Sequence, residues 1–265
     1  MVTPVLRKPL FVANWKMNKL QAEAKEFFEE FSRGFSAAAD TKNNLVDAAI
    51  AAPFTCISTA TKILGNTAGV IVGAQNVHWL DSGAHTGEIS SPMLKELGAQ
   101  FVIVGHSERR QFYGETNDGV SKRAQAALKH GLITIVCVGE SKQEFEDGAT
   151  KPVISKQLRE SLYLILQASP ASPVASLIIA YEPVWAIGTG LAATPDIVAD
   201  IHAHIRNELC QLFKKSVVDT HILYGGSVSE DNIAQLLALK NVDGVLVGSA
   251  SLSAKVFLKL IETAR

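Results

Sequence analysis

The chain has 265 residues, of which 47% are hydrophobic, and this is enough apolar surface to bury the core of one large domain. The net charge of −1, with no long run of either sign, argues against nucleic acid or a membrane surface as a partner. The three cysteines are far apart, which fits a reducing compartment, and no apolar run resembles a signal peptide or a membrane span, so we expect a cytoplasmic protein.

Short apolar runs alternate with longer amphipathic segments along the whole chain. The runs predicted to be strands are Leu10–Ala13, Asp47–Ala52, Val70–Ala74, Phe101–Val104, Leu132–Val138, Leu177–Tyr181, Thr220–Tyr224 and Gly244–Val247. In the first helical pattern, one apolar stripe comprises Leu20, Ala24, Phe27, Phe28, Phe31 and Phe35. Strands that alternate with helices indicate right-handed crossovers and a parallel sheet.

Eight such units, at a spacing of roughly 30 residues, favour a closed (β/α)8 barrel that forms a single domain over residues 1–265. The alternative is a doubly wound open sheet. That fold usually has fewer strands, and the GxGxxG that would follow its first strand in a dinucleotide-binding protein is absent.

The residues that could carry chemistry lie directly after the predicted strands. Asn14 and Lys16 follow the first strand, His106 and Glu108 the fourth, and Glu182 the sixth. Each has an ordinary explanation, such as a solvated lysine or a carboxylate that caps a turn. Because the carboxyl ends of all strands meet on one face of a barrel, coincidence becomes less plausible, and we expect these groups around one cavity.

Two further features suggest a ligand. Pro183 ends the sixth strand, and Gly188 and Gly190 follow it in a loop that could change shape, although a plain tight turn would look similar. After the seventh and eighth strands, Gly-Gly-Ser ending at Ser227 and Gly248-Ser249 expose backbone N–H groups at helix N-termini, which suit an anion such as phosphate.

Five segments, AYEPVWAIGTG, VIVGHSERR, ANWKMN, LYGGSV and DGVLVGSASL, resemble the triosephosphate isomerase family and occur in the family's order. The resemblance extends from Phe11 to about Leu260. It implies the interconversion of dihydroxyacetone phosphate and glyceraldehyde 3-phosphate through an enediolate, in glycolysis and gluconeogenesis, with no cofactor and no metal.

The resemblance also implies a role for each side chain at the strand ends. Glu182 matches the base, and His106 matches a neutral imidazole that donates to the substrate oxygens. Lys16 matches the cation that balances phosphate and enediolate, and Asn14 matches a polar donor. Glu108 matches an acidic partner that is expected to pair with Lys16 before substrate binds.

Loops supply the remaining implied parts. The backbone grip on phosphate comprises Gly188, Ser227, Gly248 and Ser249, beside Asn14 and Lys16. A mobile lid covers residues 183–193 and includes Pro183, Trp185, Ile187, Gly188, Thr189 and Gly190, and Tyr224 and Ser227 match its latch. Thr86, in the long loop after the third strand, is implied to reach a second subunit of a homodimer and to support its Asn14 and Lys16.

The sequence departs from the family pattern at several positions. Ser249 replaces a more usual glycine, His85 a loop aromatic and Phe145 an arginine, and 191–193 is less polar than in many relatives. The alternatives are an isomerase of a four-carbon sugar phosphate, with a roomier cavity, and a catalytically silent phosphate-binding barrel. The latter is expected to lack the base or the lysine, which are both present.

Overall fold

The structure is a computed structural model that describes residues 7–39, 47–168, 176–187, 193–213 and 219–263. Eight parallel strands form a closed barrel in which each pairs with the next and β8 pairs with β1. The strands are β1 (Leu10–Asn14), β2 (Asp47–Ala52), β3 (Val70–Ala74), β4 (Phe101–Val104), β5 (Ile133–Val138), β6 (Leu177–Tyr181), β7 (Ile222–Tyr224) and β8 (Gly244–Val247). The predicted (β/α)8 barrel is confirmed, and the open sheet is excluded.

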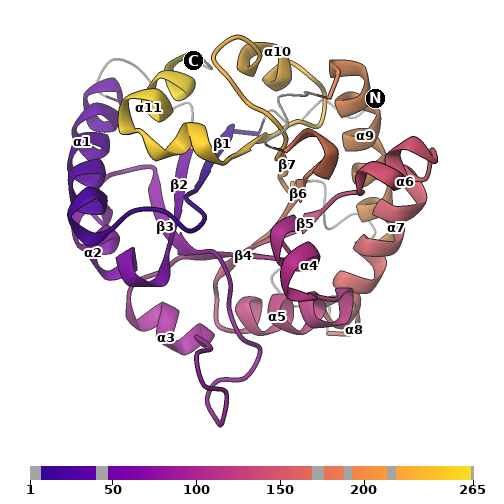
Figure 1. Cartoon of the computed structure of the whole chain (residues 1–265), viewed down its shortest axis with the longest axis horizontal. Helices are drawn as coiled ribbons and strands as arrows, with labels where there is room; N and C mark the ends of the chain where they lie inside the picture. The colour runs from indigo at the N-terminus through magenta and orange to yellow at the C-terminus, as the bar shows by residue number, and fades with distance from the viewer. Residues whose placement is uncertain (1–6, 40–46, 169–175, 188–192, 214–218, 264–265) are drawn as a thin grey trace.

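Helices surround the barrel on its outside (Figure 1). The described α-helices are α1 (Gln21–Ala39), α2 (Phe54–Leu64), α3 (Ser91–Glu96), α4 (Ser107–Tyr113), α5 (Asn117–Lys129), α6 (Lys142–Glu146), α7 (Thr150–Ser161), α8 (Tyr163–Gln167), α9 (Pro195–Phe213), α10 (Ile233–Leu237) and α11 (Ala254–Thr263). Two 3₁₀ turns, η2 (Val184–Ala186) and η4 (Ser249–Leu252), follow β6 and β8. None of these described helices combines the length and apolarity of a membrane span.

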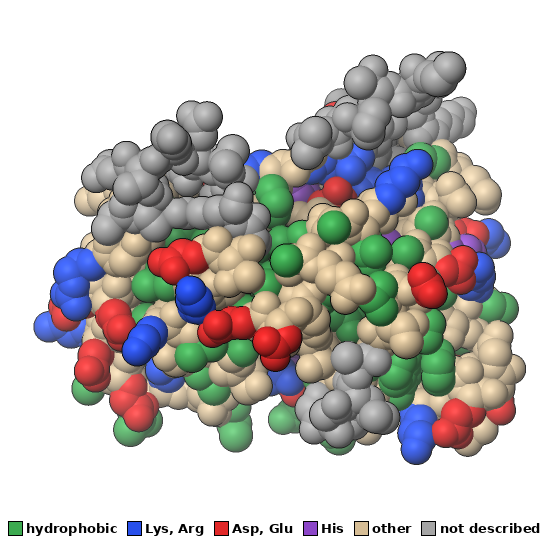
Figure 2. Space-filling model, turned by 90° about the horizontal axis from the view of Figure 1, so that it is seen from above, with side chains coloured by type: hydrophobic (Ala, Val, Ile, Leu, Met, Phe, Trp, Pro, Cys, Tyr) green, Lys and Arg blue, Asp and Glu red, His purple; other side chains and the backbone are tan. Residues whose placement is uncertain are grey.

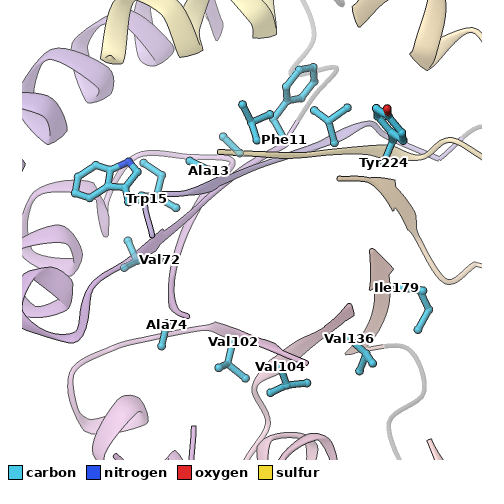
Figure 3. Packing of buried hydrophobic residues seen from close by; sticks show 14 of the residues in the cluster. Phe11, Ala13, Trp15, Val72, Ala74, Val102, Val104, Val136, Ile179 and Tyr224 are labelled. Carbon is cyan, nitrogen blue, oxygen red and sulfur yellow. The ribbon is translucent and has the colours of Figure 1, made fainter. Parts of the chain in front are cut away.

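Alternate residues of each strand face opposite sides of the barrel wall, as the two-residue period of a strand requires. Leu10 and Val12 of β1 pack in the barrel interior, whereas Phe11 and Ala13 belong to the core between strands and helices. Figure 3 shows this outer core, with side chains from several strands directed away from the barrel axis. Figure 2 shows acidic and basic side chains interspersed over the visible side of the molecule.

Two predicted strands begin later in the structure, because tertiary partners decide where a strand begins, and β1 ends one residue later than predicted, at Asn14. Leu132 precedes β5, since its N–H binds the Ala127 carbonyl at the end of α5. Thr220 precedes β7, and its carbonyl accepts from Arg206. Leu20 was predicted to belong to the buried stripe of the first helix, and this prediction is wrong. Leu20 lies one residue before the start of α1, and its side chain is 77% exposed.

A column of stacked aromatic rings fixes the end of β1 against two helices. Trp15 stacks on Phe28 of α1 with 4.8 Å between ring centroids and meets the edge of Phe27 at 4.8 Å. Phe27 stacks on Phe31 at 5.8 Å, and Phe31 stacks on Phe257 of α11 at 5.6 Å. All five rings are buried. Burial of such rings contributes several kcal/mol, so the column holds the backbone from Asn14 to Lys16 in place.

We predict that Phe28→Ala lowers the free energy of unfolding by about 3–5 kcal/mol, because it removes the ring on which Trp15 stacks and leaves a cavity. Denaturant unfolding followed by circular dichroism measures this change. Tyr163→Ala, at a side chain that is 55% exposed, is the control and is expected to cost less than about 1 kcal/mol. Equal losses in the two variants would contradict a structural role for the column.

Candidate active site

The carboxyl ends of β1, β4, β6, β7 and β8 surround one cavity of about 320 Å³. Its lining includes these residues expected from the sequence: Asn14, Lys16, His106, Glu182, Ile187, Ser227, Gly248 and Ser249. Glu108 does not line this cavity but contacts Lys16 from beside it. The parallel strand direction therefore brings together groups that lie far apart in the chain.

Glu182 is the most tightly held acidic group of the cavity, with 2% of its surface exposed. It directly follows β6, and its backbone N–H binds the Val138 carbonyl of β5. One carboxylate oxygen, Oε1, lies 3.0 Å from His106 Nε2, and the other, Oε2, accepts from the Ser107 backbone N–H at 2.8 Å. The carboxylate is thus fixed by one side chain and one amide at the start of α4.

His106 is the N-cap of α4, and its ring orientation follows from that position. Its Nδ1 atom accepts from the Glu108 backbone N–H at 3.2 Å. A ring nitrogen that accepts this bond carries no proton, so the single proton of the neutral imidazole sits on Nε2 and is donated to Glu182. The preceding residue, Gly105, has φ +71°, which turns the chain from β4 into the helix.

Charge and burial act in opposite directions on this pair. Burial raises the pKa of Glu182, but His106 and the Ser107 N–H together lower this pKa by more than burial raises it, so the net shift is downward. Burial lowers the pKa of His106, while the neighbouring Glu182 carboxylate raises it in this arrangement. The N–H of Glu108 that points at Nδ1 opposes a second proton on the ring, and we therefore assign the neutral form.

Lys16 and Glu108 form an ion pair of 2.6 Å beside the cavity, as expected for the state without substrate. Lys16 has φ +53°, a conformation that costs about 1 kcal/mol or more for a residue with a side chain. Its N–H donates to Asn14 Oδ1 at 3.1 Å, and its carbonyl accepts from Gln75 Nε2 at 2.9 Å. These two bonds hold the strained backbone that directs the ammonium group.

Gln75 and Gly139 also support the site and were not among the predicted residues, although both directly follow predicted strands. Gln75 also donates to the Ala51 carbonyl of β2 and so joins the ends of two strands. Gly139 has no room for a side chain, because a Cβ there would lie 1.8 Å from the Glu182 carbonyl oxygen. Position after a strand was the available signal, but only the tertiary contacts show what each residue supports.

The described residues of the predicted anion site, Ser227, Gly248 and Ser249, line the same cavity as Glu182. Gly248 faces Lys16, since a Cβ on Gly248 would lie 3.8 Å from Lys16 Nζ. Ser249 begins the η4 turn, and it is not among the described non-glycine residues with positive φ. The serine therefore carries none of the backbone strain that would follow if this position required a glycine.

The described part of the predicted lid consists of Pro183, the η2 turn, Ile187 and Ala193. Gly188, Thr189 and Gly190 lie outside the described residues, as do 191 and 192. Trp185 donates from Nε1 to Glu140 Oε1 at 2.8 Å and stacks on Phe145 at 4.2 Å. The departure at Phe145 thus gives the start of the lid an aromatic partner on α6.

The segment between β3 and α3 extends away from the barrel (Figure 1), and Thr86 on it is exposed. The ring of His85 packs on His78 with 4.4 Å between centroids, so the departure from the family pattern at His85 is accommodated within the loop.

A second cavity of about 200 Å³ lies beside Lys16. Its lining includes Met17 and Tyr113, which are 95% and 71% exposed.

Among the described residues, no three His, Cys, Asp or Glu side chains gather as a metal site would require. His202 and His204 of α9 have separate partners: His202 bonds to the Asn241 carbonyl, and His204 to Ser155 Oγ. The cavity lining contains an imidazole, an ammonium group and backbone amides, which can stabilise negative charge.

The family model described as triosephosphate isomerase matches residues 9–264. Among similar proteins, triosephosphate isomerase of Solibacter usitatus is 44% identical, covering 97% of this chain and 99% of its own length. That of Chlamydia muridarum is 43% identical, covering 94% and 88%. A crystal structure of triosephosphate isomerase from Bartonella henselae has a TM-score of 0.85 at 37% identity, covering 97% and 98%. The chain therefore belongs to the triosephosphate isomerase family.

Proposed function

We propose that Glu182, His106 and Lys16 carry out the isomerisation of dihydroxyacetone phosphate and glyceraldehyde 3-phosphate that characterises this family. The observation that carries these assignments is the convergence of a buried carboxylate, an imidazole N–H and an ammonium group on one cavity. The reaction moves a proton between neighbouring carbons, so it needs a base on carbon and donors for the oxygen that becomes negative.

Glu182 is proposed as the base. In the ligand-free arrangement its carboxylate is occupied by His106 Nε2 and the Ser107 N–H. A substrate in the cavity competes for the imidazole proton, which frees Oε1 to remove a proton from the carbon next to the carbonyl. The same carboxyl group then returns the proton to the neighbouring carbon. The hydroxyl proton passes to the former carbonyl oxygen by way of the donors at these oxygens, which completes the isomerisation.

His106 and Lys16 are proposed to stabilise the enediolate. The Nε2–H of His106 donates to the oxygens that gain charge, and the N–H bond into Nδ1 keeps the ring in the tautomer that can donate. Lys16 exchanges Glu108 for the substrate, and Asn14 donates to the same oxygens. The enclosed cavity strengthens each of these interactions, because it excludes part of the solvent that would screen them.

The phosphate is proposed to bind the backbone N–H groups near Ser227, Gly248 and Ser249. These residues line the cavity on the side of β7 and β8, and Lys16 adjoins Gly248. Gly188 and the lid over residues 183–193 complete this grip in the proposal, with Tyr224 and Ser227 as its latch. A dianion held there places the reacting carbons toward Glu182 and His106.

Glu182→Asp is predicted to lower kcat by about 10²-fold or more, since the shorter side chain withdraws the carboxylate by about 1 Å. A coupled assay on glyceraldehyde 3-phosphate measures the change, with erythrulose phosphate as the four-carbon comparison. Glu146→Asp, on the exposed face of α6, is the matched control and should retain the kcat of the unsubstituted chain. An undiminished rate in Glu182→Asp would point to another base.

The lowered pKa of Glu182 predicts how the rate depends on pH. The carboxylate form is the base, so kcat/KM falls as the pH drops through this pKa. His106→Gln removes the larger of the two influences that lower the pKa of Glu182, while burial still raises this pKa. The acidic limb of the pH profile should therefore move to higher pH. His204→Gln, whose ring contacts Ser155 outside the cavity, should leave the limb in place. A limb unchanged by His106→Gln would contradict the coupling.

A homodimer in the cytoplasm is also part of the proposal. Thr86 of one chain would enter the 200 Å³ cavity of a second copy, beside Lys16 and under the exposed Met17 and Tyr113. Apolar side chains this exposed beside a cavity favour a protein partner over solvent. The inserted loop would then support the residues after β1, as the family resemblance implies.

Thr86→Arg is predicted to shift the chain toward monomers and to lower kcat, because a long charged side chain does not fit this small cavity. Sedimentation equilibrium across a concentration series measures the mass. Val256→Arg, at a partly exposed position of α11, should leave the mass unchanged. A monomer for the unsubstituted chain would refute the dimer.

A further inference from the structure

Arg110 of α4 has no part in the proposed chemistry, yet its side chain binds the turn that precedes His106, the partner of Glu182. With Glu182 and Ser107 it lines a third cavity, of about 710 Å³, which is separate from the proposed substrate cavity. We propose that Arg110 is a positioning residue for the isomerisation, which fixes the turn that carries His106 and Ser107. This inference rests on the roles proposed above for His106 and Glu182.

The guanidinium group of Arg110 binds backbone carbonyls at the ends of two strands. Its Nε donates to the Gly105 carbonyl at 2.8 Å, and its Nη2 donates to the Cys137 carbonyl at 3.1 Å. The ladder between β4 and β5 ends at the pair Val104 and Val136, so the Cys137 carbonyl lies one residue beyond it. Arg110 thus continues the connection between these strands after their own hydrogen bonds have stopped.

The Gly105 contact acts directly on His106. The carbonyl of Gly105 and the backbone nitrogen of His106 belong to one planar peptide group, so a fixed carbonyl fixes the start of α4. Gly105 has φ +71°, and a Cβ on it would lie 3.0 Å from Arg110 Nη2, so the turn and the guanidinium fit closely together. The next two residues provide both groups that hold Glu182, namely His106 Nε2 and the Ser107 N–H.

Further contacts set the orientation of the guanidinium plane. Its Nη1 binds Asn117 Oδ1 of α5, and its Nη2 lies 3.3 Å from Ser161 Oγ of α7. Asn117 is itself held by Glu160, whose Oε2 accepts from Nδ2 at 2.8 Å. This arrangement needs several donors in one fixed plane, which arginine has and lysine lacks.

A purely structural arginine and a positioning arginine predict different kinetics. The described residues of the proposed phosphate grip after β7 and β8, Ser227, Gly248 and Ser249, line a cavity that Arg110 does not line, so substrate binding should survive its replacement. Disorder of the Gly105–His106 turn would instead weaken the donor and the base together. The loss should therefore fall on kcat, with KM nearly unchanged, whereas a role in stability alone would alter only the unfolding transition.

The test compares Arg110→Lys, which keeps the charge but loses the planar fork, with Arg159→Lys, the same change at an arginine of α7 that pairs with Glu208 of α9. We expect Arg110→Lys to lower kcat by about 10–100-fold with KM within about threefold, as for a small misplacement of reacting groups. Arg159→Lys should stay within about twofold of the unsubstituted chain in both constants. A folded Arg110→Lys variant with the original kcat would overturn the proposal.

A second measurement does not depend on turnover. In spectra of ¹⁵N-histidine-labelled protein, the unsubstituted chain and Arg159→Lys should both show His106 as a neutral ring protonated on Nε2, and Arg110→Lys should lose or broaden this signal. An unchanged signal in Arg110→Lys would overturn the proposal. If the unsubstituted chain showed no isomerase activity, the proposed function would fail while this readout still reported the turn.

Should Arg110→Lys fail to fold, Asn117→Ala takes its place. It leaves Arg110 intact but releases Nη1, so kcat is expected to fall by about threefold or more with KM retained. A folded Asn117→Ala variant with an unchanged kcat and an unchanged His106 signal would overturn the proposal.

Discussion

The contact between the Glu182 carboxylate and His106 Nε2, at 3.0 Å, is the constraint around which this barrel is arranged. A carboxylate with 2% exposure needs partners for its charge, because burial without them would favour the neutral acid. One imidazole and one backbone N–H provide those partners. Both come from the turn after β4, so the geometry of that turn decides the orientation and the proton affinity of the group after β6.

Backbone groups support this contact from several directions. Gly139 leaves space for the Glu182 carbonyl at the end of β5, and Gln75 binds carbonyls at the ends of β1 and β2. Arg110 connects the ends of β4 and β5 in the same way. Beyond the last ladder hydrogen bond of each strand, the carbonyl groups still need donors, and side chains from the loops supply them. The rim of the barrel is therefore held by polar contacts, and its wall by apolar packing.

Much of the fold could be predicted from the sequence, for a physical reason. Strands of a parallel barrel are buried on both faces, so each is a short, nearly continuous apolar run that stands out between amphipathic helices. Leu132 and Thr220 were placed wrongly because a helix end and an arginine use their backbone groups. Leu20 was misplaced because periodicity alone does not show where a helix begins.

The residues of the candidate site also fall into those that the sequence could predict and those that it could not. Lys16, His106 and Glu182 could be predicted, since chemically distinctive residues directly follow apolar strands. Gln75, Gly139 and Arg110 could not, because they act through contacts with backbone groups far away in the sequence, and a glutamine, a glycine or one of two adjacent arginines has no distinctive pattern. The family resemblance supplied the reaction, whereas only coordinates relate these supporting residues to it.

The aromatic column from Trp15 to Phe257 has a consequence for how the chain acquires its structure. It joins the residue after the first strand to α11, the final described helix, through Phe27 and Phe31 of α1. During synthesis the early segments leave the ribosome long before their last aromatic neighbour exists. Barrel closure is thus a late, non-local event, and until then the rings of α1 remain available to molecular chaperones or to mispairing.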